Sequence, residues 1–281
     1  MGIEFIESDP YSPISYVYSM SKKLFSVKSL QTIEVWESPF FGRVMTCDDV
    51  VQVTEKDEHI YHEMLAHVPL YSHHSPESVL IVGGGDGGTL REVLKHEYVK
   101  KAVLVDIDPM VIDVAKDYFP NLSSGFSDNR VDVVIADGAA YIAESQEKFD
   151  TILIDSTDPV GPATTLYQKR FFMNASKALT NKGFFVIQSE SLHFHLDIVR
   201  EIQLNLTECF IQQDIYTAPI ATYSGNWWSF SIASNSAFSR KPCRNVKLNH
   251  RFYDHDVHEA SFLPFSLCRK LEIPVTALKQ H

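Results

Sequence analysis

The chain has 281 residues, of which 44% are apolar and 22% charged, and its formal net charge is −11. This composition supports a large domain with a smaller one beside it, and it excludes a disordered chain. The acidic balance argues against nucleic-acid binding, which depends on basic side chains, and is compatible with cationic ligands. No apolar run approaches the ~20 residues of a transmembrane helix, so no membrane association is expected.

The first residues are acidic and lack the basic start of a secretory signal. The four cysteines are widely scattered, without a C-x-x-C pair, which is typical of reduced thiols. A cytoplasmic location is therefore predicted.

The N-terminal region is rich in β-branched and aromatic residues separated by turn signals. It predicts strands at 23–28, 32–37, 42–47 and 50–54. Apolar residues at helical spacing then predict a helix over 56–68. Pro69 and Pro76 bracket a polar segment, so we place an N-terminal β-strand domain ending in a helix at 1–72 and a catalytic domain at 73–281.

After Pro76, apolar runs alternate with helical patterns, as in an α/β, doubly wound parallel sheet. Helices are predicted at 89–96, at 109–118 with a proline in its first turn, and at 167–179. The predicted strands are 79–82, 102–106, 131–136, 151–155, 183–189, 211–216 and 228–234. Ligands of such folds bind beyond the carboxyl ends of the strands, and the motifs described next fall at those ends.

A glycine-rich turn follows the first of these strands. Gly83, Gly85 and Gly88 fit the spacing of a dinucleotide fingerprint, which alone is a weak signal. Asp86 lies within this turn, where its carboxylate would repel a pyrophosphate held at the helix N-terminus. The loop therefore favours a ligand that is cationic at this point.

Two further acidic residues end strands. Asp106 lies 18 residues beyond Gly88, where a carboxylate typically accepts hydrogen bonds from a ribose diol; Asp108 fits better as the cap of the next helix. Asp137 and Gly138 follow the third strand, either beside an adenine ring or as a simple turn.

The fourth strand ends in the acidic segment 155–162. Asp155 and Asp158 enter a loop stiffened by Pro159 and Pro162. Both aspartates could form Asx-turns, but one would suffice for that, so a functional loop reaching over the ligand is favoured.

These motifs resemble those of the polyamine aminopropyltransferases, the spermidine synthase family, and the resemblance runs nearly from end to end. It rests on the segments 41–45, 51–58, 61–64, 83–88 with 90–92, 155–162 and 221–223. It implies a Rossmann-like, methyltransferase-type seven-stranded sheet with a small N-terminal β domain, in homodimers or homotetramers. The implied reaction transfers the aminopropyl group of decarboxylated S-adenosylmethionine to putrescine, giving spermidine and 5′-methylthioadenosine, with no further cofactor and no metal.

The resemblance also implies roles for individual residues. Asp155 is the expected catalytic acid–base residue. Contacts to the nucleoside co-substrate are expected from Gln31, Asp86, Asp106, Asp137, Gly138 and Pro162. Contacts to the diamine are expected from Gln52, Tyr61, His62, Asp158 and Tyr223.

The chain departs from the family pattern at two places. Asp106 stands where Glu is common, and Ala221 stands where Pro usually precedes Thr-Tyr. Because Tyr223 belongs to the expected amine channel, the second departure bears on the choice of acceptor among putrescine, cadaverine, agmatine and spermidine.

Three other functions compete with this interpretation. A putrescine N-methyltransferase would use intact S-adenosylmethionine, which Asp86 disfavours. A nicotinamide-dependent oxidoreductase would leave the Asp155 loop unexplained, and a non-catalytic polyamine-binding protein would not need Asp155. The His/Asp-rich segment 254–259 and the pair His193 and His195 are interpreted as surface features rather than metal ligands.

Overall fold

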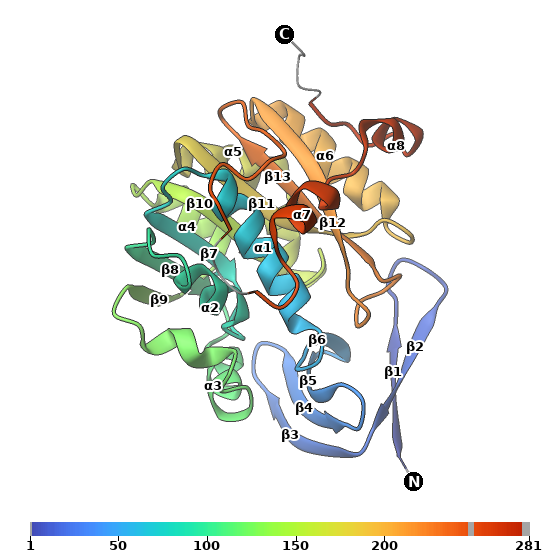
Figure 1. Cartoon of the computed structure of the whole chain (residues 1–281). Coiled ribbons are helices and arrows are strands. Elements are labelled where there is room, and N and C mark those ends of the chain that lie inside the picture. The colour runs from blue at the N-terminus through green and yellow to red at the C-terminus, as the bar shows by residue number, and fades with distance from the viewer. Residues whose placement is uncertain (1, 247–249, 277–281) are drawn as a thin grey trace.

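The structure, a computed structural model, describes residues 2–246 and 250–276. A small N-terminal β part lies against one end of a larger three-layer part built on a seven-stranded sheet (Figure 1). This architecture is the predicted fold class.

The N-terminal part contains a hairpin and a meander. The meander strands β3 (Lys22–Lys28), β4 (Thr32–Ser38), β5 (Gly42–Cys47) and β6 (Val50–Thr54) are those predicted from the sequence. Asp48 and Asp49, with φ of 46° and 66°, form the two-residue turn that joins β5 to β6. The hairpin of β1 (Ile3–Ser8) and β2 (Ser15–Met20) was not assigned from the sequence; Phe5, Tyr18 and Met20 pack it against the meander.

Helix α1 (Glu58–Ser72) continues four residues past its predicted end and includes Pro69. The predicted end of the helix at residue 68 was therefore wrong by four residues. A later segment of the chain stabilises this end of the helix. Arg244 donates hydrogen bonds to the carbonyl oxygens of Leu70 and His73, at 2.5 and 2.9 Å. The helix packs against strands β10, β11 and β12 of the large sheet.

The large sheet has the strand order β12-β13-β11-β10-β7-β8-β9. Its strands are β7 (Ser78–Gly83), β8 (Lys101–Asp106), β9 (Val131–Ile135), β10 (Phe149–Asp155), β11 (Leu179–Ser191), β12 (Gln212–Pro219) and β13 (Trp227–Ser234). Strand β13 is antiparallel to both neighbours, which corrects the expectation of a wholly parallel sheet. The connection from β12 to β13 is too short for the crossover that a parallel pair requires.

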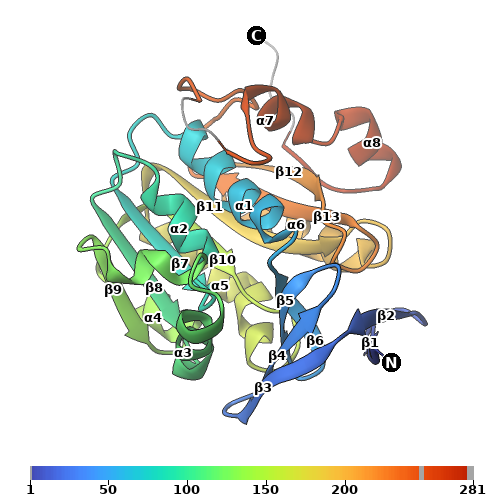
Figure 2. The same cartoon turned by 60° about the horizontal axis from the view of Figure 1, so that its bottom comes forward.

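Helices cover both faces of this sheet (Figure 2). On β7, Val79 and Ile81 pack towards α1 and α2 (Gly88–Leu94), whereas Leu80 and Val82 pack on the opposite face, towards α4 (Gly138–Glu144), α5 (Lys169–Ala178) and α6 (Leu196–Cys209). The remaining elements are α3 (Pro109–Tyr118), η1 (Ser123–Ser127), η2 (Gly161–Tyr167), α7 (His255–Ser261) and α8 (Phe265–Lys270). Within the described ranges, no helix has the length and apolarity needed to cross a bilayer.

Candidate active site

A cavity of about 410 Å³ lies between the N-terminal meander and the carboxyl edge of the large sheet. Its wall combines residues of β5 and β6 with the loops that follow β7, β8, β9 and β10. All the site residues expected from the sequence except His62 line it: Gln31, Gln52, Tyr61, Asp86, Asp106, Asp137, Gly138, Asp155, Asp158, Pro162 and Tyr223.

Close backbone contact brings the glycine loop and the Asp155 loop together. Gly83 and Asp155 are paired at the ends of β7 and β10, and the amide of Gly84 donates to the carbonyl oxygen of Asp155 at 2.8 Å. Gly83 has a φ of 81°, and a Cβ there would lie 2.0 Å from that carbonyl oxygen. The strand order changes direction at β7 and β10, which is where ligands of doubly wound sheets bind.

Asp86 is held by a chain of ionic contacts. Its Oδ1 accepts from the amide of Gly88 at 2.6 Å, and its Oδ2 lies 3.4 Å from Nε2 of His62. His62 Nδ1 lies 2.7 Å from Glu58, which in turn accepts two hydrogen bonds from Arg91. His62 therefore lies behind Asp86, with 2% of its side chain exposed, rather than on the cavity wall.

The charges of these contacting side chains favour the ionised forms of both His62 and Asp86. Burial opposes the charge on His62, but Asp86 and Glu58 outweigh it and hold the pKa of His62 well above its usual value. Burial likewise raises the pKa of Asp86, but the His62 cation outweighs it, so the pKa is lowered. The pair presents an ionised carboxylate to the cavity.

Asp155 lies at the centre of the cavity wall. Its Oδ1 accepts from the hydroxyl of Tyr61 at 2.9 Å, whereas its buried Oδ2 has no hydrogen-bond partner among the described residues. Burial and the nearby Asp86 carboxylate raise the pKa of Asp155. The Tyr223 ring packs edge-on against Tyr61, and its hydroxyl donates to the carbonyl oxygen of Gln52 at 2.7 Å. Tyr61 therefore orients an Asp155 carboxyl group that lines the cavity.

The next two strand ends line the other side of the cavity. Asp106 accepts from the amide of Asp108 at 2.9 Å, and burial raises its pKa to about 6. Asp108 caps α3, as predicted. Asp137 caps α4 by accepting from the amide of Ala140, and a Cβ at Gly138 would lie 2.2 Å from the Val82 side chain. Each aspartate therefore has a local structural role in addition to its place on the wall.

A smaller cavity of about 50 Å³ adjoins the first and shares Asp158, Tyr61, Gln52 and Tyr223 with it. Burial, and then the Glu190 carboxylate, raise the pKa of Asp158 well above its usual value. Burial also raises the pKa of Glu190 to about 7. This end of the site concentrates buried carboxylates.

The N-terminal hairpin supplies further acidic side chains at this end of the site, and His195, just before α6, contacts one of them. Glu7 lines the small cavity, and burial raises its pKa to about 7. Nε2 of His195 lies 2.9 Å from Asp9 and Nδ1 lies 2.8 Å from Glu190. Glu190 has a φ of 70°, and such strain in a non-glycine residue persists where the surroundings enforce it, often at functional sites.

These residues were missed from the sequence. The interpretation of His195 as a surface residue was wrong, since it is 3% exposed, whereas His193 is exposed as expected. Glu7 and Asp9 alternate on an acidic N-terminal strand, which was the one available signal. The segment 254–259 lies away from the cavity, where Asp254 caps α7.

Comparisons with known proteins agree with this geometry. Residues 58–242 match the family model of the spermine/spermidine synthase domain, and residues 4–55 match that of the spermidine synthase tetramerisation domain. The chain is 53% identical over 270 residues to polyamine aminopropyltransferase 1 of Aquifex aeolicus (strain VF5), covering 96% of both chains. It is 43% identical over 235 residues to the polyamine aminopropyltransferase of Bacillus subtilis (strain 168), covering 83% of this chain and 85% of that one.

Two solved structures share the whole fold. A spermidine synthase in complex with the transition-state analogue AdoDATO has a TM-score of 0.91 at 36% identity, covering 97% of this chain and 96% of that chain. The spermidine synthase from Thermotoga maritima has a TM-score of 0.88 at 34% identity, covering 97% and 95%. The chain belongs to the spermine/spermidine synthase family and is a transferase of the polyamine aminopropyltransferase type.

Proposed function

We propose that the protein transfers the aminopropyl group of decarboxylated S-adenosylmethionine to putrescine, giving spermidine and 5′-methylthioadenosine. The observation that carries the proposal is the position of Asp155 on the wall of the larger cavity, hydrogen-bonded to Tyr61, which lines both cavities; each cavity is lined by carboxylates. We call the larger cavity, with Asp86, the donor end and the smaller one, with Asp158, the acceptor end. No cofactor other than the co-substrate is needed for this reaction.

At the donor end, Asp86 would select the decarboxylated donor. Its ionised carboxylate attracts the terminal ammonium of the aminopropyl arm and repels the carboxylate of intact S-adenosylmethionine. The same repulsion disfavours a putrescine N-methyltransferase. Asp106 is close enough to the cavity to accept hydrogen bonds from the ribose diol, and Gln31, Asp137, Gly138 and Pro162 would enclose the nucleoside.

At the acceptor end, Asp158 would hold the far ammonium of putrescine while the near amine approaches Asp155. An amine with a pKa of ~10.4 must lose a proton before it attacks, at a cost of about 4.6 kcal/mol at pH 7. The position of Asp155 on the cavity wall and its raised pKa suit acceptance of that proton. Burial and Asp155 raise the pKa of Tyr61 well above its usual value, so its hydroxyl stays a donor that orients Asp155.

In the reaction the amine nitrogen forms a bond to the aminopropyl carbon as the bond from that carbon to sulfur breaks. The electron pair of the broken bond goes to sulfur, so the sulfonium becomes a neutral thioether. The attacking amine has given one proton to Asp155 before this step, and its nitrogen keeps the other two, so the product is a secondary ammonium. Alignment of nitrogen, carbon and sulfur by the two ends of the site would contribute more than proton transfer, since positioning can supply ~7–11 kcal/mol.

The proposal is tested by mass spectrometry of the products formed from decarboxylated donor and a panel of putrescine, cadaverine, agmatine and spermidine. We expect 5′-methylthioadenosine with spermidine as the fastest product. A parallel incubation of putrescine with intact S-adenosylmethionine tests the competing reaction. N-methylputrescine in that incubation, or no transfer from the decarboxylated donor, would refute the proposal.

We also propose that the protein assembles into dimers or tetramers in the cytoplasm. Ile6 and Val17 are paired across the N-terminal hairpin and remain 56% and 60% exposed, within the segment that matches the tetramerisation domain. Such an apolar pair suits contact with a second copy. Light scattering of the native protein and of an Ile6→Lys variant measures the assembly, and an unchanged mass would remove the hairpin from the interface.

A further inference from the structure

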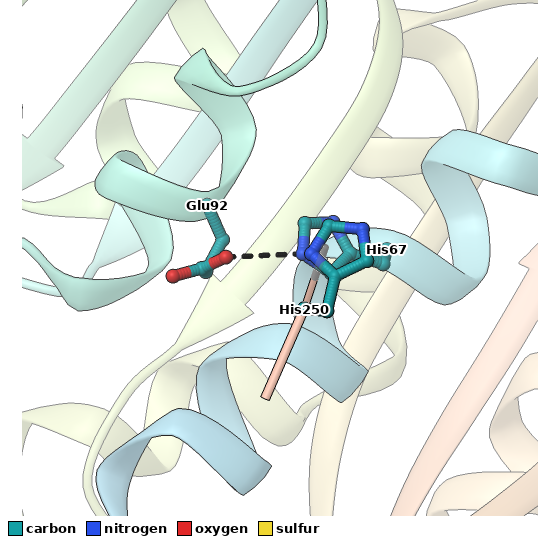
Figure 3. Close-up of side chains that lie close together, drawn as sticks. All are labelled: His67, Glu92 and His250. Carbon is teal, nitrogen blue, oxygen red and sulfur yellow. Dashed lines mark hydrogen bonds and ion pairs between the residues drawn. The ribbon is translucent and has the colours of Figure 1, made fainter. Parts of the chain in front are cut away.

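Two histidines and a glutamate lie close together outside the catalytic cavity (Figure 3). His67 comes from α1, Glu92 from α2 and His250 from the segment before α7. One ligand atom of each lies within 4.8 Å of the others. His67 and Glu92 are buried, at 0% and 1% exposure, and none of the three lines the cavity described above.

His250 is the unexplained member of this cluster. Both of its ring nitrogens are buried, and neither has a hydrogen-bond partner among the described residues. Its ring packs on that of His67, with centroids 3.8 Å apart. A buried imidazole without partners is costly unless something satisfies its nitrogens, and the pair of rings offers nitrogen ligands.

His96 orients His67 within the cluster. Its Nε2 lies 2.9 Å from Nδ1 of His67, while Nε2 of His67 lies 3.0 Å from Glu92. If His67 donates its Nδ1 proton to His96, a lone pair on Nε2 faces the carboxylate. Metal-binding histidines are held in this way, with the second ring nitrogen hydrogen-bonded to a neighbouring group.

Both oxygens of Glu92 have partners, but one of these partners can move away. Oε1 accepts from Nε of Arg91 at 2.7 Å, and Oε2 contacts Nζ of Lys95 at 2.5 Å. The Lys95 side chain is 36% exposed, so its ammonium can turn to solvent when a cation takes its place.

We propose that His67, Glu92 and His250 bind a Zn²⁺ ion through two imidazole nitrogens and one carboxylate oxygen, with water as the fourth ligand. Tetrahedral zinc with bonds of ~2.0–2.1 Å needs ligand atoms about 3.3 Å apart. The three ligand atoms must therefore approach one another by about 1.5 Å at most. His250 can move by this amount because it lies outside the helices and strands. Nearby, the amides of Arg251, Phe252 and Tyr253 donate to Glu63 of α1.

The bound ion would hold the segment before α7 against α1 and α2. This role is structural and independent of the proposed reaction. It predicts that Zn²⁺ raises the unfolding temperature, because a ligand that binds the folded chain stabilises it.

The experiment uses the full chain, stripped with a chelator and titrated with Zn²⁺ against a chromophoric competitor. We expect each chain to bind one Zn²⁺ ion tightly. His250→Gln removes a ligand and abolishes this binding, and His96→Gln weakens it by about 10- to 100-fold. Lys95→Gln removes the competing cation and tightens binding severalfold. His255→Gln, on the exposed side of α7, is the matched control and leaves binding unchanged.

Unfolding temperatures of all the variants are recorded with and without Zn²⁺, and circular dichroism confirms that each one folds. Any of three results would overturn the proposal: no tight Zn²⁺ binding by the wild-type chain, tight Zn²⁺ binding retained by folded His250→Gln, or weaker Zn²⁺ binding by Lys95→Gln.

Discussion

At the donor end Asp86 lies 3.4 Å from a buried imidazole, whereas at the acceptor end Asp158 lies among other carboxylates. The contact with His62 keeps the pKa of Asp86 low, and it stays ionised over the neutral range. At the acceptor end burial dominates, and the pKa values of Glu7 and Glu190 rise to about 7. Asp86 at the donor end therefore carries a fixed charge, whereas Glu7 and Glu190 at the acceptor end carry charge that depends on pH near 7.

This difference in charge between the two ends suits the two substrates. A donor that must be distinguished from its carboxylated precursor requires a permanent negative charge at one point. A diamine brings its own cations, and it can displace protons from carboxylates that are neutral in the free protein. Each prediction below tests part of this contrast, from the largest expected effect to the smallest.

Asp155 lines the larger cavity and contacts Tyr61, which lines both cavities, so its loss should have the largest effect. We expect Asp155→Asn to lower kcat by about 10²- to 10⁴-fold, the usual contribution of a positioned acid–base group, with donor affinity kept within a few-fold. Steady-state kinetics and donor titration measure the two quantities. Asp117→Asn, at an exposed position of α3, is the matched control. Near-normal turnover would remove Asp155 from the mechanism.

Asp86→Asn tests the fixed charge. It leaves the His62 cation, behind the cavity wall, without its carboxylate partner, so the preference for decarboxylated over intact S-adenosylmethionine should fall by about 10- to 100-fold, the range for hydrogen bonds to charged groups. Competition between the two donors in a binding assay measures it. Unchanged selectivity would show that other residues choose the donor.

His62→Gln sharpens the same test. Without its cation partner, the pKa of Asp86 should rise because burial is no longer opposed. Donor affinity should then weaken more steeply below neutral pH in the variant than in the wild-type protein, where Asp106 ionises near pH 6 but Asp86 stays charged. The same profile in both proteins would mean that His62 does not control the charge of Asp86.

The sequence predicted the donor end better than the acceptor end for a physical reason. Asp86, Asp106 and Asp155 follow strands of one sheet, and the ends of parallel strands meet whatever the rest of the chain does. Glu7 and Asp9 instead reach Asp158 through a hairpin that lies about 150 positions away in the sequence. No local pattern encodes such a contact.

Two other features that were not predicted from the sequence have local explanations. Glu58 and His62 are one helical turn apart on α1, so their pairing could have been predicted, but the link from His62 to Asp86 crosses between elements. The apolar pattern of β13 does not indicate whether the strand runs parallel or antiparallel to its neighbours. The short 220–226 connection was the available signal.

KM for putrescine should depend on pH across the neutral range, whereas the charge of Asp86 does not. Glu7 and Glu190 ionise near pH 7, while putrescine stays doubly protonated, so KM for putrescine should fall from pH 6 to 8, by up to about tenfold per pH unit for each carboxyl proton released on binding. KM for the donor should change mainly near pH 6, where Asp106 ionises, and should level off above pH 7. Glu190→Gln should flatten the putrescine profile, and Glu201→Gln on α6 is the control. A putrescine profile unchanged by Glu190→Gln would assign the dependence elsewhere.

The smallest effect concerns stability. Carboxyls whose pKa rises on folding stabilise the free protein at low pH, and this contribution is lost as the pH rises from about 4.5 to 7 through the values of Glu7 and Glu190. Putrescine offsets that loss by pairing with the ionised forms. If its affinity is tenfold weaker at pH 6, a concentration of 100 Kd at pH 8 stabilises by ~2.7 kcal/mol there and by about 1.4 kcal/mol at pH 6.

That difference corresponds to a rise in Tm about 3–5 °C larger at pH 8 than at pH 6, measured by calorimetry. Sodium chloride at matched ionic strength controls for general screening. An equal shift at both pH values would mean that the acceptor carboxylates are already ionised in the free protein, and the contrast between the two ends of the cavity would then fail.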